Sequence, residues 1–282
     1  MNMSQRDDRP IGIFDSGLGG LTVAAALIQR FPAENIIYLG DTARVPYGGK
    51  SVKSLMEFAR QDARFLLSKQ VKLVVAACNT VSAVAMPALK EVCGEIPFLG
   101  VIESGVHAAV ASGARNILVI GTRTTISSGA YAEAIRKANP EIKVASVACP
   151  LLVPLAEEGI VSGEIVERVL ELYLAPFRSE PPDAVLLGCT HYPLFRTAVE
   201  SWFHGRTKVI DSGSACAEKV AGVLAENGLE AEQGRTGTHD YYVTDYPAGF
   251  HPLAERFLGR TIERVFPADL GTVGTEGTGK KD

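Results

Sequence analysis

VVAACNT (residues 74–80) is an apolar run typical of a buried strand, and it ends on a cysteine that is followed by an amide and a hydroxyl side chain. VLLGCTH (residues 185–191) repeats this pattern further along the chain. A buried cysteine usually packs as a small hydrophobic residue, and a core has no need for polar residues directly after it. The pair therefore predicts two similar halves, each presenting a cysteine at the end of a strand.

Strands and helices alternate on both sides of this pair, which is typical of α/β architecture with mostly parallel sheets. Three motifs, IFDSG (13–17), VIESG (101–105) and VIDSG (209–213), are each expected to end a strand on a carboxylate. A single helix is expected over 81–93. The expected strands cover 11–15, 35–41, 72–78, 97–102, 116–121, 142–149, 183–189 and 207–211, and a last strand, helix and strand lie within 239–266.

Composition and charge exclude several classes of protein. The chain has 282 residues and a formal net charge of −4, and it lacks the basic patch that a nucleic-acid surface requires. The polar N-terminus is not typical of a secretory signal, and no apolar stretch is long enough to span a membrane. We therefore expect a cytoplasmic protein with neither nucleic acid nor membrane as a partner.

The five cysteines form no C-x-x-C pair, so a zinc site or a thioredoxin-like motif is not indicated. In a reducing compartment stable disulfides are rare. We expect Cys93, Cys149 and Cys216, which lack polar followers, to be core residues. Cys78 and Cys189 are the candidates for chemistry.

Both candidate thiols lie at a strand end and just before an expected helix, where open α/β sheets bind their ligands. The N–H groups of a helix N-terminus lower the pKa of a thiol, and a pKa near neutrality would make these thiols effective bases. His191, two residues after Cys189, is a candidate proton partner for that thiol.

The segment IFDSGLGGLTV (13–23) places glycines between a strand and a helix, as a dinucleotide site does. The fingerprint is incomplete, because Thr22 stands at the last glycine position and Asp15 would repel a pyrophosphate. We instead expect the glycines to let the backbone approach a small anionic ligand at the helix start. Asp15 would then address an ammonium group or a thiol, and Ser16 a carboxylate.

Two further loops carry polar groups after strands. In DTARVPYGGK (41–50), Pro46 and the glycines are expected to hold Tyr47 at a loop tip, where its hydroxyl and nearby N–H groups suit carboxylate capture. GTRTTISSGAY (121–131) clusters hydroxyl groups, and the pattern does not separate helix caps from ligand contacts.

These motifs together resemble the bacterial glutamate racemases. The resemblance rests on IFDSGLGGLTV, DTARVPYG, ACNTVSA, GTRTT, CPLLVPLAEEG and GCTHYPL, which occur in the family's order over about residues 11–215. It implies a cofactor-independent enzyme that interconverts L- and D-glutamate and supplies D-glutamate for peptidoglycan. It also implies two α/β domains with the active site in the cleft between them: 11–103 plus 213–267, and 104–212, with 1–10 and 268–282 as flexible termini.

The resemblance also implies roles for single residues. It places the two catalytic thiols on Cys78 and Cys189, with Asp15 and His191 as their respective helpers. Glu157 resembles an acid near that histidine, and the adjacent Glu158 is the alternative. The implied substrate contacts are Asp15, Ser16, Tyr47, Gly48, Asn79, Thr80, Thr122, Thr125, Thr190 and His191.

The residues themselves are compatible with these roles. Neither a metal-ligand pattern nor a lysine in a Schiff-base context is evident, so we expect no metal and no other cofactor. Two alternatives stay open: a related two-cysteine racemase acting on aspartate or another acidic substrate, and a non-catalytic binding protein with two α/β lobes. A homodimer is also left open.

Overall fold

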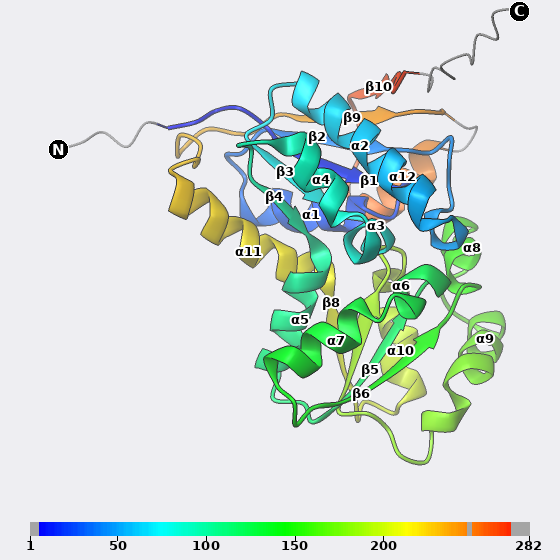
Figure 1. The fold of residues 1–282 in the computed structure, drawn as a ribbon. Coiled ribbons are helices and arrows are strands. Elements are labelled where there is room, and N and C mark those ends of the chain that lie inside the picture. The colour runs from blue at the N-terminus through cyan, green and yellow to red at the C-terminus, as the bar shows by residue number, and fades with distance from the viewer. Residues whose placement is uncertain (1–5, 247–249, 272–282) are drawn as a thin grey trace, which may run out of the picture.

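Two parallel β-sheets organise the chain, seen one above the other in Figure 1. The computed structural model describes residues 6–246 and 250–271. Sheet A has the strand order β10-β9-β2-β1-β3-β4 and sheet B the order β6-β5-β7-β8. The strands are β1 (Ile11–Asp15), β2 (Ile36–Gly40), β3 (Leu73–Ala76), β4 (Phe98–Gly100), β5 (Asn116–Gly121), β6 (Lys143–Ala148), β7 (Ala184–Gly188), β8 (Lys208–Asp211), β9 (His239–Val243) and β10 (Val265–Pro267).

Helices cover both sheets, as the alternating sequence predicts, and the two-sheet α/β fold class is confirmed. β1, β2 and β7 are buried along their whole length, which is why they read as continuous apolar runs. The helices are α1 (Leu21–Arg30), α2 (Val52–Ser68), α3 (Asn79–Val84), α4 (Met86–Cys93), α5 (Val101–Ala111), α6 (Arg123–Ser127), α7 (Ala130–Ala138), α8 (Leu152–Glu157), α9 (Glu164–Leu174), α10 (Arg196–Trp202), α11 (Ser212–Asn227) and α12 (Phe250–Leu258), with short 3-10 turns η1 (Tyr47–Gly49), η2 (Ala175–Phe177) and η3 (Tyr192–Phe195).

The C-terminal part of the chain packs onto the first half. β9 pairs with β2, and β10 extends the same sheet. α5 leads from sheet A to sheet B, α11 leads back, and the two helices pack against each other. The strands of the C-terminal part thus belong to sheet A, while the domain boundaries that the resemblance implies stay a prediction.

The sheet registers bring together the strand ends that carry the candidate residues. In sheet A, β1 lies between β2 and β3, with Asp15 opposite Gly40 and Phe14 opposite Ala76. In sheet B, Gly121 lies opposite Gly188. The carboxyl ends of neighbouring parallel strands share one edge of a sheet, so each sheet offers one cysteine-bearing edge.

Two sequence expectations about these elements are wrong. Residues 81–93 form parts of two helices, because Pro87, in the first turn of α4, cannot continue the preceding helix. VIESG (101–105) does not end a strand, since β4 ends at Gly100 and α5 begins at Val101. The Val101 N–H donates to Ser82 Oγ instead of continuing the ladder.

The remaining cysteines and the chain ends have clear positions. Cys93, Cys149 and Cys216 are buried thiols, as expected for core residues.

Part of the predicted flexible N-terminus is held in place: the Asp7 N–H donates to the Glu230 carbonyl, and Lys72 Nζ donates to the Asp7 carbonyl. The other end of that terminus, and most of 268–282, lie outside the described residues. Within the described part of the chain, the helices are too short or too polar to cross a bilayer.

Candidate functional site

A cavity of about 450 Å³ lies where the cysteine-bearing edges of the two sheets meet. α3 and α6 contact each other there, and α6 also contacts η1. Figure 1 shows α3 and α6, with α8 nearby, at the junction of the upper and lower halves. The cavity is lined by Ser16, Val45, Pro46, Tyr47, Gly48, Gly49, Cys78, Asn79, Thr80, Thr122, Arg123, Pro150, Val153, Pro154, Glu157, Cys189, Thr190 and His191.

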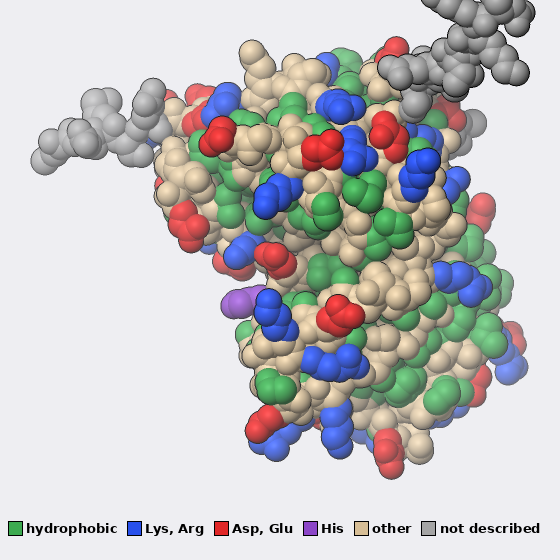
Figure 2. Space-filling view, in the orientation of Figure 1, with side chains coloured by type: hydrophobic (Ala, Val, Ile, Leu, Met, Phe, Trp, Pro, Cys, Tyr) green, Lys and Arg blue, Asp and Glu red, His purple; other side chains and the backbone are tan. Residues whose placement is uncertain are grey.

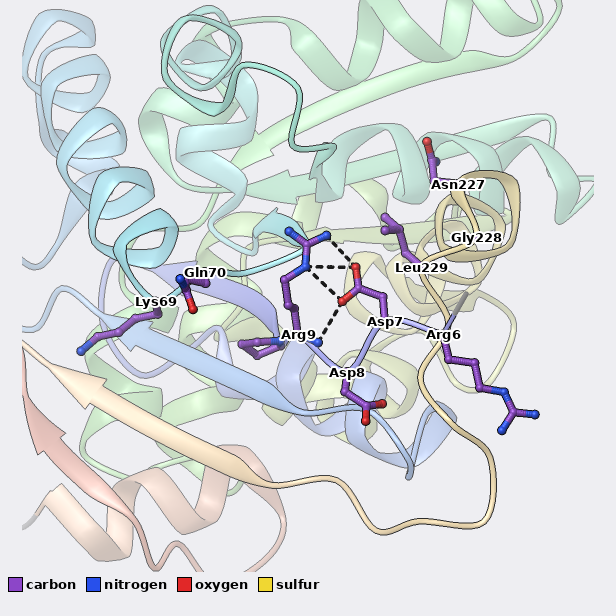
Figure 3. A pocket seen from close by; sticks show the side chains of 10 residues that line it. Arg6, Asp7, Asp8, Arg9, Lys69, Gln70, Asn227, Gly228 and Leu229 are labelled. Carbon is purple, nitrogen blue, oxygen red and sulfur yellow. Dashed lines mark hydrogen bonds and ion pairs between the residues drawn. The ribbon is translucent and has the colours of Figure 1, made fainter. Parts of the chain in front are cut away.

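A larger hollow of about 960 Å³ lies at the other end of sheet A, beside Pro10 and Gln70, which precede β1 and β3. Two of its charged groups are paired with each other: Figure 3 shows the Arg9 guanidinium directed at the Asp7 carboxylate. Open α/β sheets bind ligands at the carboxyl ends of their strands, which is where the smaller cavity lies. The smaller cavity is therefore the candidate site.

Cys78 follows β3 and caps the N-terminus of α3. Its side chain is 5% exposed, and Sγ lies 3.8 Å from Ser16 Oγ. Burial, and next the charge of Asp15, raise the pKa of this thiol to about 12. The expected lowering toward neutrality is thus wrong for Cys78, because the backbone N–H of Val81 favours the thiolate less than burial opposes it.

Cys189 follows β7 and begins a chain of contacts that runs through His191 to a carboxylate. Cys189 Sγ lies 3.9 Å from His191 Nδ1, and His191 Nε2 lies 3.1 Å from Glu157 Oε1. Burial opposes a charge on this imidazole, but Cys189, Glu157 and the charge of Asp15 together raise its pKa to about 10. Of the two acids named from the sequence, Glu157 is the one that reaches the histidine.

Asp15 lies behind the cavity and does not line it. Its fully buried carboxylate accepts a hydrogen bond from the Gly17 N–H at 3.1 Å and lies 3.4 Å from Thr190 Oγ1. Burial raises the pKa of this carboxyl, and the charge of His191 opposes the rise. The structure thus brings Asp15 close to both halves of the site, and its direct contact with a substrate stays a prediction.

Asn79 and the threonines form a hydroxyl and amide wall. Thr80, Thr122 and Thr125 lie within 2.9–3.3 Å of one another through their Oγ1 atoms. The sequence pattern did not separate helix caps from ligand contacts among these hydroxyl groups. Thr122 holds both positions, because it caps α6 and also lines the cavity. Thr125 is buried and does not line the cavity, so its contact with a substrate stays a prediction.

Sequence reasoning missed two residues that orient Asn79. Asn79 Oδ1 accepts a hydrogen bond from Tyr131 Oη at 2.6 Å, and Ser212 Oγ lies 3.4 Å away. Asn79 Nδ2 is buried with no partner among the described residues. Ser212 belongs to VIDSG and Tyr131 ends GTRTTISSGAY, so both motifs were visible, but only folding brings them to Asn79. Arg123, an exposed residue of the cavity lining, was also missed.

The expected position of the Tyr47 hydroxyl is wrong. Tyr47 is 1% exposed, and its hydroxyl donates a hydrogen bond to Asp41 and lies 3.1 Å from Asp62. The hydroxyl is thus engaged with two aspartates of the protein instead of being available to the carboxylate of a ligand. The η1 turn, Tyr47–Gly49, does line the cavity. The N–H groups of Tyr47 and Gly48 therefore stay candidates for substrate contact.

Glycines near the site allow close approach between the halves. A Cβ on Gly19 would lie 2.5 Å from both His191 Nδ1 and Thr190 Oγ1. Sequence reasoning assigned that space to an anionic ligand, whereas side chains of the second half occupy it. A Cβ on Gly48 would similarly lie 2.7 Å from Thr122 Cβ.

The site thus presents two thiols, one from each sheet, to one cavity together with donors that suit a carboxylate. Such an arrangement can take a proton from one side of a bound carbon and return a proton on the other.

On the face shown in Figure 2, Lys and Arg side chains are interspersed with Asp and Glu side chains rather than gathered into one basic patch.

Comparisons with known proteins give one consistent result. Residues 24–220 match the family described as Asp/Glu/Hydantoin racemase. The glutamate racemase of Neisseria meningitidis serogroup C is 45% identical over 264 residues, which are 93% of this chain and 97% of that protein. The crystal structure of glutamate racemase from Francisella tularensis in complex with D-glutamate superposes with a TM-score of 0.88 at 40% identity, over 94% of this chain and 98% of that one. Picrophilus torridus aspartate racemase shares the fold alone, with a TM-score of 0.55 and 20% identity over 80% of this chain and 96% of that one.

Proposed function

Because the chain belongs to the Asp/Glu/Hydantoin racemase family, and within it to the glutamate racemases, we propose that it interconverts L- and D-glutamate with two thiols as its acid and base. The enzyme class is an amino-acid racemase, an isomerase. The observation that carries the mechanism is the placement of Cys78 and Cys189, from different sheets, in the lining of one cavity. The D-glutamate formed would serve peptidoglycan synthesis.

Inversion at the α-carbon requires loss of a proton from one face and delivery of a proton to the other. By the family resemblance, the thiolate of Cys189 takes the α-proton of L-glutamate, and the thiol of Cys78 gives its own proton to the opposite face. The reverse reaction exchanges these roles. One proton is gained and one is lost, so the carbon skeleton undergoes no oxidation or reduction.

The surroundings of the thiols support this proposal. The imidazole of His191, whose pKa is raised to about 10, lies 3.9 Å from Cys189 Sγ and is hydrogen-bonded to Glu157. On the other side, the ammonium group of the substrate would supply the charge that the buried Cys78 needs to ionise. Asn79 Nδ2 is buried without a partner among the described residues, and the η1 residues line the cavity. We propose that Asn79 Nδ2 and the N–H groups of η1 bind the substrate carboxylate while the carbanion forms.

Glutamate is the proposed substrate rather than aspartate. The named relatives at 40% identity and above are glutamate racemases, whereas the aspartate racemase shares only the fold. Rates on the two amino acids at equal concentration test this choice. A higher kcat/KM for aspartate would overturn it.

The proposal is tested with purified, chelator-treated protein and L-glutamate, followed by circular dichroism of the substrate. We expect complete racemisation without any added metal or pyridoxal phosphate. Cys78→Ser and Cys189→Ser should each stop net racemisation, because the hydroxyl pKa lies far above neutrality. In D₂O, any residual exchange should favour L-glutamate in Cys78→Ser and D-glutamate in Cys189→Ser. Full racemisation by either serine variant, or activity that depends on an added cofactor, would refute the two-thiol mechanism.

A further inference from the structure

Two buried aspartates lie behind the cavity and contact the η1 turn from different elements. Asp41 follows β2 and Asp62 belongs to α2, and both side chains are 0% exposed. Between them, Tyr47 Oη is hydrogen-bonded to Asp41 Oδ2 and lies 3.1 Å from Asp62 Oδ2. Arg44 also bridges them, with Nε 2.5 Å from Asp41 Oδ2 and Nη2 3.2 Å from Asp62 Oδ1.

The hydrogen bonds of this cluster need one proton more than Tyr47 can supply. A phenol carries a single O–H and can donate to only one acceptor. If its contacts with both carboxyl groups are hydrogen bonds, one carboxyl group must carry a proton and donate it to the Tyr47 oxygen.

The neighbours of each carboxyl group indicate which one carries the proton. Asp41 faces three donors, namely Arg44 Nε, Tyr47 Oη and Thr244 Oγ1, the last at 3.0 Å. Among the described residues, Asp62 faces Arg44 Nη2 and no other side-chain donor besides the tyrosine. Burial, and then the charge of Asp41, raise the pKa of Asp62 well above its usual range, while Arg44 opposes the rise. A charged Asp41 paired with Arg44, beside a neutral Asp62, leaves no uncompensated charge.

The η1 turn that this cluster holds is part of the cavity wall. Tyr47, Gly48 and Gly49 all line the cavity, and Thr124 Oγ1 of α6 donates a hydrogen bond to the Gly48 carbonyl at 2.9 Å. The turn is thus fixed to the first half through Tyr47 and Arg44, and to the second half through Gly48. A change in the cluster would move the backbone groups proposed above to bind the substrate carboxylate.

We propose that Asp41 and Asp62 are positioning residues for the substrate cavity, in which a charged Asp41 and a proton-bearing Asp62 hold the η1 turn through Tyr47. Neither residue touches the cavity, so both act through the turn. The effect on catalysis rests on the proposed function, but the effect on the turn does not.

The substitution of aspartate by asparagine should give different results at positions 41 and 62. Asp62→Asn keeps a donor for the Tyr47 oxygen and an acceptor for Arg44, so KM for glutamate should stay within about twofold of wild type. Asp41→Asn removes the charge that compensates Arg44 and should raise KM by roughly tenfold with a smaller change in kcat. Asp62→Leu and Tyr47→Phe, which cannot complete the cluster, should also raise KM.

A second measurement is independent of activity. Amide hydrogen exchange of a peptide covering residues 41–50 should accelerate in Asp41→Asn and Asp62→Leu and stay at the wild-type rate in Asp62→Asn. Glu34→Gln is the matched control, because Glu34 is a buried carboxylate before the other end of β2, 2.6 Å from Lys72 Nζ. It should lower the Tm without changing KM or exchange in 41–50.

The outcomes separate this proposal from the proposed function. Racemisation by the wild-type protein with equal KM and equal exchange in all variants would refute the positioning role. Equal damage from Asp41→Asn and Asp62→Asn would refute the assignment of the proton. A wild-type protein that does not racemise glutamate would refute only the proposed function, and the exchange rates would still decide the proposal.

Discussion

At the scale of single residues, the protonation of His191 connects the site to pH. Its pKa is raised from 6.5 to about 10 because contacts with Cys189 and Glu157 outweigh the effect of burial. A raised pKa means that the charged imidazole stabilises the fold fully below the unfolded value of 6.5, and that this contribution is lost as the pH rises through about 10. Below about pH 10 the imidazole therefore keeps its charge, 3.9 Å from Cys189 Sγ.

Glu157→Gln should therefore lower the pKa of His191, since a carboxylate that favours the imidazolium is lost. We expect the alkaline limb of the pH profile of kcat/KM to move to lower pH, and the imidazole titration followed by NMR to move with it. Glu158→Gln is the matched control, because Glu158 is exposed and adjacent but makes no contact with His191 among the described residues. An equal shift in both variants would contradict the assignment of Glu157.

At the scale of elements, the contact between η1 and α6 depends on the absence of a side chain at one position. A Cβ on Gly48 would lie 2.7 Å from Thr122 Cβ, whereas a Cβ on the adjacent Gly49 would meet nothing within 4 Å. Neither glycine has a positive φ. The two positions therefore differ in the space around them rather than in backbone strain.

Gly48→Ala should destabilise the protein by about 1–3 kcal/mol, the usual cost of overpacking a well-packed contact. Gly49→Ala should leave the Tm unchanged or slightly raised, because alanine restricts the unfolded chain more than glycine does. Thermal unfolding of both variants is the measurement. A similar loss of Tm in the two would show that η1 does not pack against α6 as described.

At the scale of the whole molecule, one hydrophobic cluster spans both sheets, while further clusters lie on sheet A and on sheet B separately. A single cluster of buried side chains contains Ile13 and Leu73 of sheet A together with Leu118 and Val185 of sheet B. α5 and α11 pack against each other between the sheets. We therefore expect the halves to unfold together rather than one after the other.

The single tryptophan of the chain allows a direct test. Trp202 ends α10, which packs beside β8 of sheet B, so its fluorescence reports on the second half, while far-UV circular dichroism reports on the whole chain. The two signals should give coincident denaturant transitions with one midpoint. Separate midpoints would show that the sheets unfold independently.

Much of the architecture could be predicted from local sequence patterns. Apolar runs followed by helical periods located β1, β3 and β7, and the matching contexts of Cys78 and Cys189 placed both thiols at strand ends. Local rules failed where a neighbouring element decided the outcome. VIESG is helical from Val101 onward, where the Val101 N–H donates to Ser82 Oγ of another helix. The helix expected over 81–93 is a different case, because it divides at Pro87, a local signal that the expectation overlooked.

The sequence by itself determined the alternation of strands and helices, the two thiols at the ends of sheet strands and the family to which the chain is similar. These follow from the residue types of short segments, which report burial and backbone preference directly. Only the tertiary structure decided that Glu157 reaches His191, that Tyr47 turns to Asp41 and Asp62, and that burial raises the pKa of Cys78. Each of these depends on residues brought together from separate elements, and the burial and charge that act on them exist only when the two sheets close on each other.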